Sequence, residues 1–92
     1  MQASGGRPER MAVFQLVRIV LNERYQAVAR VSLQPLFELR EDAMAMAEFS
    51  AARSNGDYSY DRERDCWWAT DPSGRMIRFV VEPIASETSL AA

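Results

Sequence analysis

Two stretches near the start of the chain have the hydrophobic pattern of β-strands. Residues 13–21, VFQLVRIVL, are mostly apolar and rich in β-branched side chains, which favour an extended backbone. Residues 25–33, YQAVARVSL, alternate apolar positions with mostly polar ones, and Pro35 follows as a stop. The few residues between the two stretches are too short a connection for a parallel crossover. We therefore expect an antiparallel hairpin that turns around Asn22 and Glu23.

The next segment has the composition of an α-helix. Residues 38–56, ELREDAMAMAEFSAARSNG, are dense in Ala, Met, Glu and Arg and contain no Pro and no internal Gly. Acidic side chains from Glu38 to Asp42 lie at the positive end of the helix dipole, and Asn55 can take the positive φ of a helix stop. Phe49 lies beside the apolar stripe, and we expect it to tuck under a strand edge rather than anchor a partner. The side expected to lie on the sheet comprises Leu39, Ala43, Met46, Ala47, Ser50 and Ala51.

A second hairpin is predicted after the helix. Residues 71–74, DPSG, have the Asp, Pro and Gly of a β-turn in their preferred order. The flanking stretches, RDCWWAT at 64–70 and RMIRFVVE at 75–82, are strand-like. The order β-β-α-β-β predicts an α+β fold, in which one helix packs on one face of a four-stranded antiparallel sheet.

The ends of the chain lack such periodicity. Residues 1–10 and 85–92 are expected to be flexible tails, and residues 11–84 a single α+β domain. So small a domain has little core of its own, and a second subunit would add burial.

Neighbouring residues of a strand point to opposite faces of the sheet, so odd and even positions of each predicted strand can be assigned to the helix side or to the open side. Trp67 is assigned to the helix side as a core residue and Trp68 to the open face. The other side chains expected under the helix are Val17, Ile19, Leu21, Tyr25, Ala27, Ala29, Val31, Leu33, Ala69, Ile77, Phe79 and Val81.

The opposite, open face is predicted to be apolar with several arginines, which is typical of a recognition surface. Trp68 is expected across from Arg78, within reach of a cation–π contact. The predicted interaction surface comprises Phe14, Leu16, Arg18, Val20, Val28, Arg30, Trp68, Met76, Arg78 and Val80.

The composition argues against catalysis and metal binding. The chain has no His and a single cysteine, Cys66, so a structural zinc site, an intramolecular disulfide and a Cys–His pair are excluded. Cys66 is interpreted as a small buried hydrophobe. The acidic stretch at 57–65, DYSYDRERD, lacks the Gly and Glu of a calcium loop and is interpreted as a solvated loop and strand edge, with the YSY tyrosines packing there. We expect a non-enzymatic protein without cofactors.

Charge and hydropathy restrict the partners and the location. All 11 basic residues are Arg, which a GC-rich genome explains without a functional reason, and the net charge is −2. No apolar run is long enough to cross a bilayer, and residues 1–10 have no apolar leader. A cytoplasmic protein without membrane contact is therefore expected.

Two functions fit the predicted open face. In the first, the chain is a protein-interaction module that homodimerises through this face or packs it on another protein. In the second, Arg18, Arg30 and Arg78 contact nucleic acid while Trp68 stacks on it. The slight negative charge, the absence of Lys and the aliphatic residues favour a protein partner. A different helix crossing, or tails folded over the face, would remove the site.

Two segments resemble sequences of a known kind. LREDAMAMAEFSAA at 39–52 and YDRERDCWWATDPSGRMIRFVVEP at 60–83 are similar to small bacterial proteins of unknown function, and the resemblance spans residues 13–83. It implies a helix-on-sheet domain and transfers no site residues.

Overall fold

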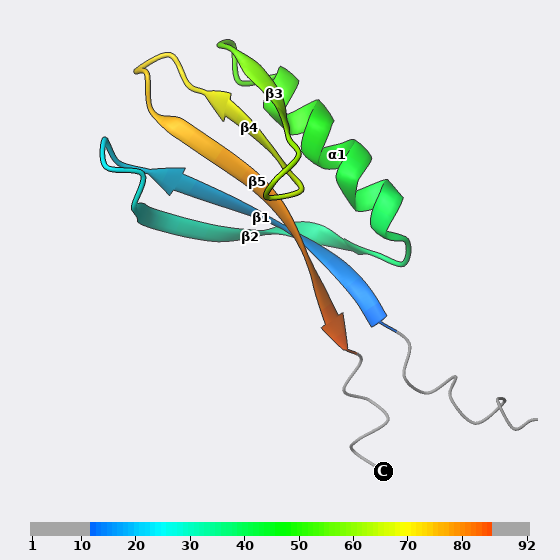
Figure 1. Ribbon diagram of the computed structural model, residues 1–92. Helices are drawn as coiled ribbons and strands as arrows, with labels where there is room; N and C mark the ends of the chain where they lie inside the picture. Colours follow the sequence, from blue (N-terminus) through cyan, green and yellow to red (C-terminus); the bar gives the residue numbers. More distant parts are fainter. Residues whose placement is uncertain (1–11, 86–92) are drawn as a thin grey trace, which may run out of the picture.

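The computed structural model describes residues 12–85, which form five strands and one helix in the order β-β-α-β-β-β (Figure 1). The sheet is antiparallel throughout, with the strand order β2-β1-β5-β4-β3. The α+β class is confirmed, but the predicted number of four strands was wrong. The predicted tails lie outside the described residues, apart from Ala85, which ends the last strand. The elements are β1 (Ala12–Leu21), β2 (Ala27–Phe37), α1 (Arg40–Ala52), β3 (Tyr58–Asp61), β4 (Cys66–Thr70) and β5 (Met76–Ala85).

The additional strand is β3, a four-residue edge strand within the acidic stretch. Its residues pair with β4, with Tyr60 opposite Trp67. The ring centroids of Tyr60 and Trp67 are 5.6 Å apart, and those of Tyr58 and Trp67 are 6.3 Å apart. The predicted packing of these tyrosines at a strand edge is thus confirmed. The stretch was not predicted as a full strand because four mostly polar residues give almost no periodic signal.

The strand β2 is longer than predicted, because it continues through Pro35 to Phe37. The Gln34–Pro35 peptide bond is cis. Proline has no N–H to donate, which an edge strand tolerates and a central strand does not. The predicted stop at Pro35 was wrong, because β2 is an edge strand and can continue through a proline.

The predicted turn at residues 71–74 is confirmed. The N–H of Gly74 donates to the carbonyl of Asp71 at 2.8 Å. The Asp71 carboxylate accepts bonds from the Ser73 hydroxyl at 2.6 Å and from the Arg75 N–H at 3.0 Å. These donors, the Ser73 hydroxyl first, hold the pKa of Asp71 below its ordinary value. Asn55 has the predicted positive φ, 66°, after the helix.

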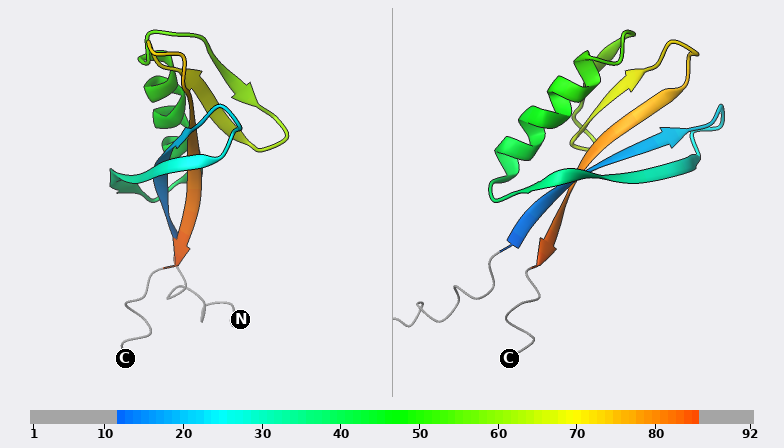
Figure 2. Two further views of the ribbon diagram at one scale, coloured as in Figure 1. Left: turned by 90° about the vertical axis from the view of Figure 1, so that its left-hand side faces the viewer. Right: turned by 180° about the vertical axis from the view of Figure 1, so that it is seen from behind.

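The helix α1 lies on one face of the sheet, chiefly over β5, β1 and β4 (Figure 2). It approaches through Ala43, Ala47 and Ala51, which are fully buried and spaced one turn apart. Leu39 and Met46, expected on this side, are 53% and 39% exposed, so they do not belong to the buried contact. The sheet supplies most of the bulky side chains of the core, so the fully buried helix residues are small, and Met44 packs against the core only partly buried. The core cluster comprises Leu16, Val20, Ala43, Ala47, Ala51, Ala69, Ile77, Phe79 and Val81.

The predicted face assignment of β1 was reversed. Leu16 pairs directly with Val81 and Val20 with Ile77, and residues directly opposite in an antiparallel pair share a face. Leu16 and Val20 therefore belong to the core under α1, and Val17 points away from the helix although it is 0% exposed. Residues 13–21 are apolar at both parities, so their pattern carries no face signal.

Candidate interaction surfaces

The structure divides the predicted interaction surface between the two faces of the sheet. Four of its members come from β1 and lie on the helix side. The remaining six lie on the face away from the helix. The helix-side residues are Phe14, Leu16, Arg18 and Val20. Those on the opposite face are Val28, Arg30, Trp68, Met76, Arg78 and Val80. The ten residues therefore do not form one surface.

The two adjacent tryptophans take the predicted sides. Trp67 packs against the core cluster under α1. Trp68 is half-buried on the other face and pairs directly with Arg78. With Tyr25 and Met76 these two residues line a shallow hollow of about 350 Å³. This confirms one core tryptophan and one tryptophan on the face away from the helix.

Of the two arginines on this face, Arg30 is engaged in an ion pair, as is Arg64 in the neighbouring β3–β4 turn, whereas Arg78 takes part in none of the ion pairs among the described residues. The Arg30 guanidinium lies 2.5 Å from the Glu82 carboxylate. The Arg64 guanidinium lies 3.1 Å from the Asp61 carboxylate. The pKa of Asp61 is lowered, chiefly by the hydrogen bond from the Arg64 backbone N–H. These carboxylates reduce the positive charge that the face presents to an anion.

Cys66 is buried on the same face, with 1% of its surface exposed. Burial raises the pKa of its thiol, and the nearby Asp61 carboxylate adds to the shift. The thiol therefore stays protonated and behaves as a small apolar side chain, because nucleophilic attack requires the thiolate.

A polar cluster connects the start of α1 to the turn between β3 and β4. The Tyr60 hydroxyl donates to the Asp65 carboxylate, which also pairs with the Arg40 guanidinium. The bond to Asp65 raises the pKa of Tyr60. The cluster is exposed and its groups satisfy one another, so it holds the β3–β4 turn against the helix. Within residues 12–85, no three His, Cys, Asp or Glu side chains gather to hold a metal ion.

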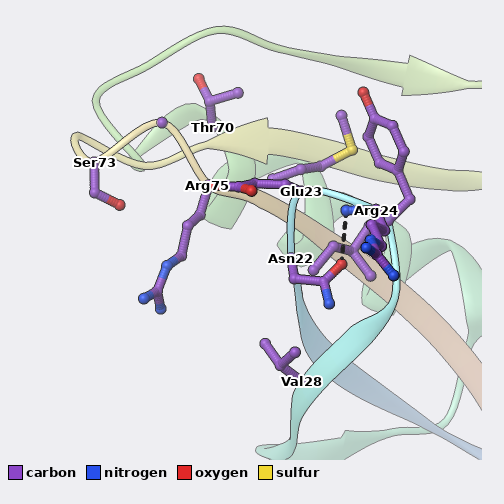
Figure 3. Close-up of a pocket in the computed structure, with 11 residues that line it drawn as sticks. Asn22, Glu23, Arg24, Val28, Thr70, Ser73 and Arg75 are labelled. Carbon is purple, nitrogen blue, oxygen red and sulfur yellow. Dashed lines mark hydrogen bonds between the residues drawn. The ribbon is translucent and has the colours of Figure 1, made fainter.

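A wide hollow of about 860 Å³ separates the β1–β2 turn from the β4–β5 turn (Figure 3). At its centre the Asn22 side-chain oxygen accepts bonds from the backbone N–H groups of Arg24, drawn dashed, and of Gln26. The Arg75 side chain extends away from this turn (Figure 3). Since the Asn22 oxygen is occupied within its own turn, the hollow presents few converging polar groups to a ligand.

The most exposed apolar surface follows the edge strand β2. Nine of its eleven residues are exposed, and the other two, Leu33 and Phe37, are half-buried against the core cluster. Val28, Val31 and Leu36 are 57%, 46% and 46% exposed. One side of β2 pairs with β1, and the other side pairs with no described strand. We call these eleven residues the β2 surface. An alternating pattern gives the two faces of a strand but not its place at the edge of a sheet, so sequence reasoning missed this surface.

A groove adjoins the β2 surface on the helix side. Its volume is about 520 Å³, and Leu33, Met46, Phe49 and Phe79 contribute to its lining. Phe49 is 53% exposed, and the Arg53 guanidinium carbon lies 5.4 Å from its ring centroid, a cation–π contact. The expectation that Phe49 tucks under a strand was wrong, because α1 faces the sheet through its alanines. The groove exists because α1 covers little of β2.

Comparisons with known proteins give no information about this surface. The chain matches no protein-family model, no curated protein and no solved structure. Among the described residues, no helix has both the length and the apolar character required to cross a membrane.

Proposed function

We propose that this chain is a non-catalytic protein-interaction module that accepts an extended polypeptide strand along β2. The observation that carries the proposal is the outer edge of β2, which pairs with no described strand although the β2 surface exposes large apolar side chains. An edge strand presents a row of unpaired N–H and C=O groups, and an added strand gains main-chain hydrogen bonds and side-chain contacts.

The opposite edge of the sheet is a poorer acceptor. The strand β3 has only four residues, whereas β2 has eleven. Short edge strands are one of the ways in which proteins limit unwanted pairing. A long edge with exposed Val28, Val31 and Leu36 is the reverse arrangement, and it supports β2 as the contact strand.

The buried thiol supports the non-catalytic part of the proposal. Nucleophilic catalysis would use Cys66 as a thiolate, but burial raises the pKa of this group. The chain has no histidine to act as its base.

The nucleic-acid alternative has less support than a protein partner. It required Arg18, Arg30 and Arg78 on one face, but Arg18 lies on the helix side, opposite Phe79. Arg30 is paired with Glu82. Salt-sensitive binding to random DNA or RNA, lost in Arg78→Ala, would favour this alternative over a protein partner.

The proposal can be tested by placing a photo-crosslinking amino acid on β2 and, for comparison, on β3. Benzoylphenylalanine replaces Val28 on β2 in one variant and Ser59 on β3 in the matched control, and each is irradiated in the native host cell. We expect covalent adducts with a protein at position 28 and none at position 59, because both sites are exposed but only the first lies on the proposed surface. Adducts at position 59 alone would contradict the proposal.

A further inference from the structure

The β2 surface is suited to pairing with itself. We propose that the strand it accepts is β2 of a second copy of this chain, paired antiparallel about a two-fold axis at Val31, so that two five-stranded sheets join into one. This inference rests on the proposed function, because it names the partner of the same surface.

The symmetry restricts where the axis lies. Antiparallel pairing of two identical edges requires a two-fold axis perpendicular to the sheet, which keeps both helices on the same face. Directly opposite residues then share a face, so helix-side residues must meet helix-side residues. This match of faces requires that one residue lie directly opposite the same residue of the second copy, with the axis between the two. The central candidates are Arg30, Val31 and Ser32.

Charge disfavours one of these candidates, and the regular stretch of β2 disfavours another. An axis at Arg30 sets two guanidinium groups directly opposite one another, which is destabilising. Residues 29–33 are the part of β2 that pairs with β1 in one regular register, and an axis at Ser32 would pair only residues 31–33 of that part with the second copy.

An axis at Val31 pairs the whole regular stretch of β2, residues 29–33, with the same stretch of the second copy. Arg24 lies beside Glu23 in the turn before β2, and Glu38 directly follows the strand; both Arg24 and Glu38 are exposed, and antiparallel pairing turns these two ends of the two copies toward one another. The ion pairs found among the described residues use neither of them. Glu41 and Asp42, in the first turn of α1, add negative charge near Glu38. The regular stretch centred on Val31, with Arg24 turned toward the acidic segment that follows β2, favours an antiparallel second copy in this register.

The same register suits the apolar residues and the proline. Val31 meets Val31 across the axis, and Ala29 meets Leu33 on the helix side, where the adjoining groove lies. Pro35, which offers no N–H, lies beyond the register shift that ends this regular stretch after Leu33. The missing hydrogen bond therefore falls outside this stretch.

A charge-swap experiment on the full chain tests the axis. In Val31→Lys and Val31→Glu, each substituted residue faces its own copy, so like charges meet. We expect the dimer dissociation constant of either variant to rise at least about tenfold over that of the unchanged chain. An equimolar mixture of the two is expected to regain dimers, because Lys then faces Glu. Circular dichroism establishes that both variants fold, and Ser59→Lys on β3 is the control expected to dimerise normally.

The outcomes separate this inference from the proposed function. Single variants that dimerise as well as the unchanged chain, or a mixture that recovers no dimer, overturn the axis at Val31. A purified chain that stays monomeric, combined with crosslinks from position 28 to a different protein, overturns the second copy and leaves the proposed function in place. An absence of crosslinks at position 28 overturns both.

Discussion

Tyr25 has a backbone conformation that is unusual for a bulky side chain. Its φ is 61°, in the left-handed region where Gly or Asn is favoured. The turn enforces it, because the Tyr25 N–H donates to the Asn22 carbonyl at 2.9 Å and the Asn22 N–H to the Gln26 carbonyl at 2.9 Å. The Tyr25 side chain is 63% exposed, so little burial offsets the conformational cost.

Replacing this tyrosine is therefore expected to stabilise the chain. Tyr25→Gly removes the clash between Cβ and the backbone, and we expect the free energy of unfolding to rise by about 1 kcal/mol. Urea denaturation followed by circular dichroism measures the change. Arg24→Gly, one residue earlier and without a positive φ, is the control and should be destabilising. Equal effects at the two positions would show that the backbone of Tyr25 is not strained.

At the scale of elements, the interface between α1 and the sheet depends on small residues. Ala47→Leu adds volume where the helix has no exposed surface, and we expect a loss of about 1–3 kcal/mol in the free energy of unfolding. Ala45→Leu makes the same change at an exposed position of the same helix and should alter stability little. Thermal unfolding of both variants is the measurement. A larger effect at position 45 would mean that α1 faces the sheet through a different side.

The helices, strands and turns were predictable from the sequence where a local pattern, such as turn residues or strand alternation, pointed to one structure only. The DPSG turn, the helix and the opposite sides of Trp67 and Trp68 followed from local chemistry and parity. The face of β1 did not, because residues 13–21 are apolar at both parities and only the pairing of Leu16 with Val81 fixes it.

The candidate site was less predictable than the elements. The sequence indicated an apolar surface, but it placed this surface on one sheet face and included β1 residues that belong to the core. The β2 surface depends on strand order, and strand order is set by pairings between residues far apart in the chain, such as Arg18 with Phe79. The exposure of Phe49 likewise depends on how α1 is rotated on the sheet.

Across the whole part of the molecule that the structure describes, residues 12–85, one helix covers one part of a five-stranded sheet. A single core of about 70 residues provides only a few kcal/mol of stability, so burial supplied by a second subunit has a large relative effect. Association through β2 would cover the longer of the two edges and make the stability of the chain depend on its concentration.

Self-association through β2 is tested most directly by the molar mass of the purified chain in solution, measured by light scattering from low to high micromolar concentration. Pairing through β2 makes the mass rise from the 10.4 kDa of one chain to twice that value, and Val31→Lys is expected to remain at the mass of one chain. A chain that stays at 10.4 kDa at every concentration would contradict self-association. A Val31→Lys variant that dimerises like the unchanged chain would contradict pairing about Val31.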